Sequence, residues 1–232
     1  MYDASLGKYC DHTVLRAYTK KEVVKKFCEE AKKYGAASVC VNPVHAALVS
    51  RELAGTGIKT CTVIGFPLGA STPAVKAYEA ADAVKNGADE LDMVINVGAL
   101  RDGDDAFVSD DIAGVVKAAA GRPVKVIIET CYLTDDEKRR ASAICQKAGA
   151  AFVKTSSGFG TRGASVGDIK LIREVVGDTM QIKASTDINT QEDAKRMIEA
   201  GADRLGLSRI VQVVEGDADM PSASAYNKPP AY

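Results

Sequence analysis

Three charged residues interrupt apolar stretches of the chain in a way that could support chemistry at a carbonyl group. Asp92 lies in ELDMVIN, Lys154 in AFVKTSSG and Lys183 in QIKAST. Burying a charge is costly unless it is paired, so a charged residue within an apolar strand needs a reason. Two lysines on neighbouring strands would lower each other's pKa, and one could then be a neutral amine near pH 7. A neutral amine beside a carboxylate that transfers protons is what Schiff-base chemistry requires.

Simpler interpretations of these residues stay open at this point. A lysine at a strand end could be solvated, or salt-bridged with Asp92 as its partner. Asp92 could instead hold a loop in place by accepting backbone hydrogen bonds. The pattern alone therefore leaves an aldolase-like reaction as one hypothesis among several.

Composition limits the class of partner. The chain has 30 Lys plus Arg against 31 Asp plus Glu, with the two signs interleaved, so we expect no nucleic-acid or membrane partner and a small-molecule ligand instead. No run approaches the roughly 18 apolar residues of a membrane span, and the start MYDASLGKYCDHT lacks the features of a signal peptide. A cytoplasmic location is the resulting expectation.

The cysteine and histidine residues do not suggest a metal centre. The only histidines are His12 and His45, and no CxxC spacing occurs. We therefore expect no metal and six reduced thiols, most of which pack as small apolar groups. The cysteines are Cys10, Cys28, Cys40, Cys61, Cys131 and Cys145.

Short β-branched runs alternate with longer amphipathic segments along the whole chain, which is typical of repeated βα units around a parallel sheet. The pattern predicts an α/β fold, a (β/α)8 barrel in a single domain over residues 1–215. Residues 216–232 contain three of the seven prolines and no apolar periodicity, so we expect a flexible C-terminal tail. Strands are expected at 9–13, 38–42, 59–65, 90–96, 124–130, 151–155, 181–185 and 204–208, and helices at 20–34, 44–54, 73–86, 107–120, 135–148, 166–176 and 191–200.

Six motifs carry a specific family resemblance: KYCDHTVL, SVCVNP, CTVIGFPLGA, NGADELDMVINVGAL, VKVIIETCYLT and AGAAFVKTSSGF. They are similar, in the same order, to bacterial members of the deoxyribose-phosphate aldolase family, over residues 7–215. The resemblance implies a TIM barrel, a homodimer and a class I aldolase of deoxyribose phosphate catabolism that uses no metal or other cofactor. Such an enzyme joins acetaldehyde to glyceraldehyde 3-phosphate to give 2-deoxyribose 5-phosphate, and catalyses the reverse reaction.

The resemblance also assigns roles to individual residues. Lys154 matches the Schiff-base lysine, Lys183 the second lysine that assists proton transfer, and Asp92 the aspartate of the proton relay. Tyr232 matches a C-terminal tyrosine that some members are thought to bring to the active site, although an uninvolved chain end is the simpler interpretation. The implied substrate-binding set is Asp11, Thr13, Cys40, Thr155, Gly158, Ser185, Thr186, Asp187, Gly206, Ser208, Arg209 and Tyr232.

The phosphate end of the implied site departs from the family pattern. Thr186 and Asp187 replace a glycine pair, and Asn189 replaces an arginine. Arg209 and Arg162 also occupy unusual positions, and either could restore a positive charge. Because glycine amides approach a phosphate closely, we expect a weakened preference for phosphorylated acceptors.

Two alternatives to the family activity follow from these departures. One is the same Schiff-base chemistry on an unphosphorylated or otherwise altered acceptor aldehyde. The other is a metabolite-binding barrel without catalysis, against which the retention of Asp92, Lys154 and Lys183 argues, because burying charges without a function is costly.

Overall fold

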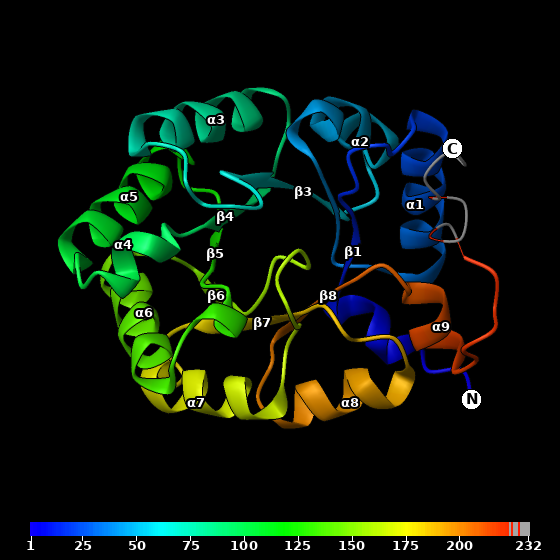
Figure 1. Cartoon of the computed structure of the whole chain (residues 1–232). Coiled ribbons are helices and arrows are strands. Elements are labelled where there is room, and N and C mark those ends of the chain that lie inside the picture. The colour runs from blue at the N-terminus through cyan, green and yellow to red at the C-terminus, as the bar shows by residue number, and fades with distance from the viewer. Residues whose placement is uncertain (223, 225–226, 228–232) are drawn as a thin grey trace, which may run out of the picture.

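The computed structural model describes residues 1–222, 224 and 227, and its eight strands form one closed parallel barrel in sequence order (Figure 1). Strand β8 pairs with β1 and closes the barrel, so the predicted (β/α)8 fold is confirmed. The strands are β1 (Cys10–Val14), β2 (Ser38–Val41), β3 (Lys59–Ile64), β4 (Glu90–Val94), β5 (Val124–Ile127), β6 (Phe152–Lys154), β7 (Gln181–Ser185) and β8 (Arg204–Leu207).

Helices surround the strands on the outside (Figure 1). The main ones are α1 (Lys21–Tyr34), α2 (Ala46–Glu52), α3 (Pro73–Lys85), α5 (Asp105–Ala118), α6 (Asp135–Lys147), α7 (Val166–Val176) and α8 (Gln191–Glu199). Shorter elements that the apolar pattern did not predict are the 3-10 helices η1 (Ala4–Tyr9), η2 (Pro43–His45) and η3 (Thr130–Tyr132) and the helices α4 (Val97–Arg101) and α9 (Ile210–Glu215).

Local sequence signals explain where several helices begin and end. Thr134 and Glu137 form a capping box at the start of α6, and Thr190 and Asp193 form another at α8. Gly35 ends α1 in the left-handed conformation that glycine adopts at little cost. The helix expected over residues 44–54 begins later, at Ala46, because η2 occupies the preceding turn.

The strands separate two kinds of side chain. Leu91 and Met93 of β4 belong to the large apolar core outside the strands, whereas Asp92 between them is fully buried on the opposite side. Because side chains alternate along a strand, every second residue points into the barrel. The interior of this barrel is therefore lined in part by charged residues.

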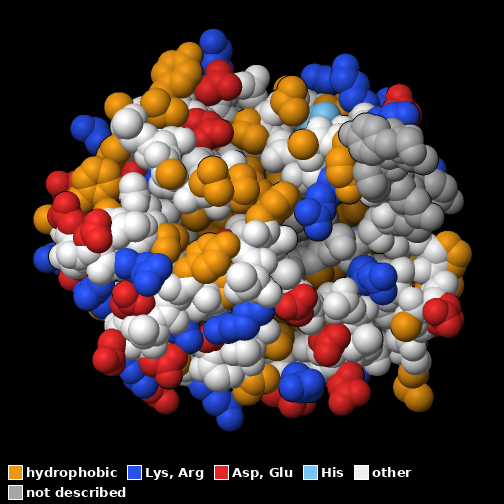
Figure 2. All heavy atoms as spheres, viewed as in Figure 1, with side chains coloured by type: hydrophobic (Ala, Val, Ile, Leu, Met, Phe, Trp, Pro, Cys, Tyr) orange, Lys and Arg blue, Asp and Glu red, His pale blue; other side chains and the backbone are white. Residues whose placement is uncertain are grey.

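Figure 2 shows the face of the barrel seen in Figure 1, with apolar side chains gathered around the mouth and charged side chains spread around the rim. Gln212 of α9 donates hydrogen bonds to Met220 O at 2.7 Å and to Ser222 Oγ at 3.1 Å. The first residues of the expected tail therefore contact α9. In the described part of the chain, no helix has the length and apolar character needed to cross a membrane.

Candidate active site

Asp92 is the centre of a charged cluster inside the barrel. Its Oδ2 atom lies 2.7 Å from Lys154 Nζ and 2.7 Å from Lys183 Nζ. Its Oδ1 atom lies 2.8 Å from Lys125 Nζ. Lys154 is 2% exposed and the other three residues are completely buried. Two ammonium groups therefore share one carboxylate oxygen, and a third holds the other oxygen.

Two further carboxylates extend the cluster toward the bottom of the barrel. Asp11 lies 2.5 Å from Lys183 Nζ and 2.7 Å from an Arg204 nitrogen. Glu90 lies 2.7 Å from Lys125 Nζ and 3.2 Å from Arg204. The cluster thus contains four basic and three acidic side chains. When all of them are ionised its net charge is +1, so the loss of one proton makes the cluster neutral.

These partners decide the protonation of the buried groups. Burial alone would raise the pKa of Asp92, but Lys125, Lys154 and Lys183 hold it well below its usual range. Burial would likewise lower the pKa of Lys183, but the carboxylates of Asp11 and Asp92 raise it above its usual value. The expectation that the two lysines depress each other's pKa is therefore wrong for Lys183, which is held as a cation.

Strand register brings the two lysines together. Lys154 is the last residue of β6 and pairs directly with Lys183 of β7. A Cβ atom on Gly206 of β8 would clash with Ser185 Oγ and lie 2.9 Å from Lys183 Cε. Glycine at this position therefore leaves room for the lysine beside the barrel wall.

Cys40 and Cys61 lie next to Asp92, on the paired positions of β2 and β3. All six cysteines are free thiols, and Cys131 alone is partly exposed. The Sγ atoms of Cys40 and Cys61 and a carboxylate oxygen of Asp92 lie within 4.8 Å of one another. This arrangement suits a metal poorly, because Lys125, Lys154 and Lys183 already bond to both oxygens of Asp92 and would repel a cation.

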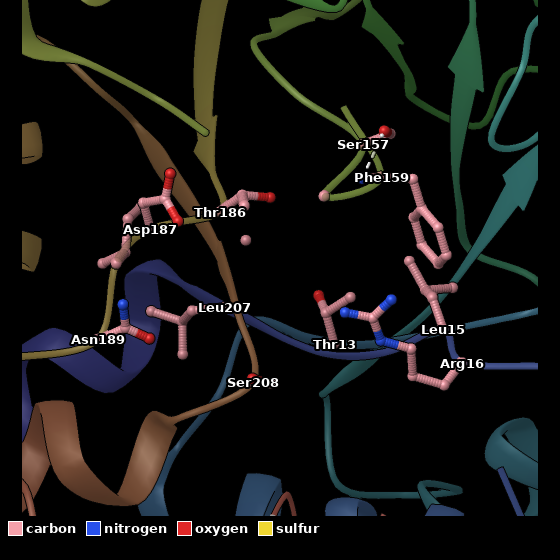
Figure 3. Close-up of a pocket in the computed structure, with 13 residues that line it drawn as sticks. Thr13, Leu15, Arg16, Ser157, Phe159, Thr186, Asp187, Asn189, Leu207 and Ser208 are labelled. Carbon is pink, nitrogen blue, oxygen red and sulfur yellow. Dashed lines mark hydrogen bonds between the residues drawn. The ribbon is translucent and has the colours of Figure 1, made fainter. Parts of the chain in front are cut away.

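A cavity of about 250 Å³ opens at the mouth of the barrel, beyond the strand ends that carry the lysines (Figure 3). Six of the predicted substrate-binding residues line it, namely Thr13, Gly158, Thr186, Asp187, Gly206 and Ser208. Lys154, the last residue of β6, and Lys183, in the middle of β7, are buried and are not among the lining residues.

The other predicted residues have different positions. Thr155 directly follows β6 and Ser185 ends β7; both are buried, and Ser185 N–H donates to Thr155 Oγ1 at 3.1 Å. Asp11 and Cys40 are buried inside the barrel. Arg209 is exposed at the N-cap of α9 and does not line the cavity. Tyr232 lies outside the described residues.

The loop between β7 and α8 keeps a glycine-like backbone although it contains no glycine. Thr186 and Asp187 have φ values of 72° and 62°, in the left-handed region. Asp187 Oδ2 accepts a hydrogen bond from Gly163 N–H at 2.7 Å, which ties this loop to the β6–α7 loop. The N–H groups of Asp187 and Ile188 have no acceptor among the described residues, and successive free amides of this kind are suited to binding an anion.

Arg162 does not reach the cavity. Its guanidinium lies 2.6 Å from Asp168 Oδ2 in α7, and Asp168 also pairs with Lys138 of α6 at 2.9 Å. This basic residue therefore holds the β6–α7 loop against the outer helices.

Sequence reasoning missed four charged residues of this region. Lys125 interrupts the apolar run VKVII in the way that Lys154 interrupts its own strand, so the same rule could have found it. Glu90 and Arg204 are the first residues of their strands, where a charged residue is common and therefore gives no signal. Arg16 lies in a loop and lines the cavity (Figure 3), and no signal in the sequence places it there.

Comparison with known proteins agrees with this geometry. Residues 6–209 match the family model described as DeoC/LacD family aldolase. A deoxyribose-phosphate aldolase of Bacillus cytotoxicus is 56% identical over 214 residues, which cover 92% of this chain and 96% of the relative. One from Bacillus cereus is 56% identical over 215 residues, with the same coverage.

Solved structures show the same similarity. The deoxyribose phosphate aldolase of Aeropyrum pernix has a TM-score of 0.86 and 33% identity, over 91% of this chain and 90% of that one.

Proposed function

The chain belongs to the DeoC/LacD family of aldolases, and from this membership we propose that it acts on 2-deoxyribose 5-phosphate through a lysine imine. It is an aldolase. The observation that carries the proposed chemistry is the pair of lysines on one oxygen of Asp92, each at 2.7 Å, below an open cavity. The substrate follows the name of the relatives that are 56% identical to this chain.

Lys154 is the nucleophile in this proposal. Among the described residues its ammonium group pairs with Asp92 alone, whereas Lys183 also pairs with Asp11, and Lys125 with Glu90. Removing a proton from Lys154 therefore breaks fewer ion pairs than removing one from either neighbour. Lys154 is also the lysine of the cluster with exposed surface, at the end of its strand.

The reaction begins when the neutral amine of Lys154 adds to the carbonyl carbon of acetaldehyde. The resulting hydroxyl leaves as water and a protonated imine forms, which acidifies the neighbouring methyl group. Asp92, acting through a water molecule, accepts a methyl proton and leaves an enamine, and Lys183 assists this transfer as the cation that holds Asp92 in place. The enamine carbon attacks the acceptor aldehyde, and hydrolysis of the new imine releases the product and frees Lys154.

The imine provides the electron sink, so the mechanism uses no metal or other cofactor. The acceptor enters through the mouth cavity, where the free amides of Asp187 and Ile188 can receive its phosphate group. Neither the unphosphorylated acceptor nor a binding barrel without catalysis gains support from the comparisons, because the similar relatives are named as deoxyribose-phosphate aldolases.

Borohydride trapping tests this proposal. Acetaldehyde followed by borohydride should modify Lys154, as mapped by mass spectrometry, and Lys154→Arg should abolish both trapping and turnover with the fold intact. Lys85→Arg, at the exposed end of α3, is the matched control and should behave as wild type. Modification of another lysine with Lys154 untouched would contradict the assignment.

Three broader expectations belong to the same proposal. The partners are small aldehydes and a sugar phosphate, the chain forms a homodimer, and the enzyme is cytoplasmic, in keeping with its free thiols. Light scattering at micromolar concentration tests the dimer, because a monomer mass would refute it.

A further inference from the structure

Arg16 has a special position among the residues that line the mouth cavity. It is the only basic side chain of the described lining residues, and it follows β1 on the side opposite Asp187 and Asn189 (Figure 3). Its guanidinium extends beside Thr13 toward the middle of the cavity (Figure 3). The cavity therefore carries one positive charge, in the β1–α1 loop, and one negative charge, in the β7–α8 loop.

Aromatic packing holds this arginine in place. The Arg16 guanidinium carbon lies 4.9 Å from the centre of the Phe159 ring, and the Phe159 ring meets Phe66 edge to face at 5.3 Å. A cation over an aromatic face is attracted to it, and a guanidinium can stack there while its N–H groups remain free to donate. Exposed arginines usually lose side-chain entropy on binding, and this stacking reduces that loss.

The other arginines around the mouth do not compete for this role. Arg162 is paired with Asp168, and Arg209 is outside the cavity lining. Asp187 adds a negative charge, although its Oδ2 atom is bonded to Gly163 N–H and so turned toward the β6–α7 loop. An anionic substrate in this cavity thus gains from a cation in another loop, and Arg16 is the one that lines the cavity among the residues that the structure describes.

We propose that Arg16 binds the phosphate group of the sugar-phosphate substrate and sets the preference of the enzyme for phosphorylated over unphosphorylated aldehydes. The inference rests on the proposed function. In it, the guanidinium donates paired N–H groups to phosphate oxygens from the β1 side, while the amides of Asp187 and Ile188 approach from the β7 side.

The test compares matched substrates in matched variants. Arg16→Gln should raise KM for glyceraldehyde 3-phosphate about 10- to 100-fold, the size expected for a lost charge-assisted contact, and leave KM for glyceraldehyde and the kcat values unchanged. Arg16→Lys should retain part of the preference, because the charge remains without the planar fork. Arg51→Gln, which removes the same charge from the exposed surface of α2 and outside the cavity lining, should leave both KM values unchanged. Higher salt should reduce the difference between wild type and Arg16→Gln.

Direct binding separates this inference from the proposed function. Glycerol 3-phosphate has no aldehyde, so calorimetry with this compound measures the anion site without turnover, and Arg16→Gln should weaken its binding by the same factor. An equal effect of Arg16→Gln on both aldehydes, or an effect of Arg51→Gln as large as that of Arg16→Gln, would overturn the role of Arg16. Failure of wild type to form the Lys154 imine would instead overturn the proposed function, whatever the binding result.

Discussion

The Oδ2 atom of Asp92 accepts hydrogen bonds from two lysines, Lys154 and Lys183. The two lysines differ in their other ion pairs, and this difference assigns them different roles. Lys183 is locked between Asp92 and Asp11, and its raised pKa makes it a permanent cation at neutral pH. In the described part of the chain, Lys154 pairs with Asp92 alone and can leave that contact to form a covalent bond with loss of one ion pair. The cluster thus divides into a fixed charge and a reactive amine.

Lys183→Met should separate these roles. The variant removes a cation next to the reactive amine, so the pH optimum should move upward and kcat should fall by about 100-fold or more. The measurement is the pH dependence of kcat/KM between pH 5 and 10 (roughly the range in which lysine and its partners titrate). An unchanged profile would mean that Lys183 is a structural ion-pair partner only.

Lys125→Met should act mainly on stability. Lys125 is fully buried between Asp92, Glu90 and Asp11, and its removal deprives each of these buried carboxylates of one ion pair. Breaking a buried pair of this kind costs about 3–5 kcal/mol, which denaturant unfolding should detect. Lys25→Met is the control, because its ion pair with Glu52 is largely exposed and should contribute little.

At the scale of elements, the loops after the strands decide specificity, and sequence patterns describe them least well. Because Thr186 and Asp187 replace a Gly-Gly pair, the sequence suggested that the backbone of this loop no longer approaches a phosphate closely. The left-handed φ values show that the backbone kept its conformation, at the cost of strain in two non-glycine residues. Side-chain bonds supply the compensation, because Asp187 ties the loop to Gly163, and no local pattern predicts a bond between two separate loops.

Asp187→Asn should test the charge of the β7–α8 loop without removing that bond. The amide oxygen can still accept from Gly163 N–H, but the negative charge near the anionic substrate is lost. We expect KM for glyceraldehyde 3-phosphate to fall a few-fold, with KM for glyceraldehyde unchanged. A rise in both values would show that the contact matters through loop order and not through charge.

The packing of α1 on β1 should make stability depend on pH. His12 is buried in β1, stacks on Phe27 at 4.2 Å between ring centres and lies 2.7 Å from Glu30. Burial lowers the pKa of His12, and the bond with Glu30 offsets only part of this effect. Below the unfolded pKa of about 6.5, the unfolded chain takes up a proton that the folded chain resists, so stability is lost as the pH falls.

Urea unfolding of the wild type at pH 7.5, 6.5 and 5.5 should therefore show a decline, which His12→Phe should reduce. The interval lies above the usual carboxylate range, so histidines dominate it. His45 is half-buried with a pKa lowered by burial, so His45→Gln should remove a smaller share of the decline. Equal declines in all three proteins would place the titrating group elsewhere.

At the scale of the whole molecule, periodicity predicted all eight strands because each is a buried apolar run followed by a helix. It also predicted Asp92, Lys154 and Lys183, since a charge within such a run stands out. The partners of these residues were harder to see. Arg204 meets Asp11 only because β8 returns to β1, and Arg16 reaches the cavity only because the mouth loops converge.

Closure of the barrel has a consequence for how the chain folds during synthesis. The β1–β8 pairing joins Asp11 to Gly206, residues from opposite ends of the chain, so the ribosome must release most of the protein before the barrel can close. Until then β1 and β7 are edge strands with unpaired backbone groups that can pair with other chains. Asp11 also lacks its ion pair with Arg204 of β8. The nascent chain therefore carries an open sheet with incompletely paired charges until its last strand is released.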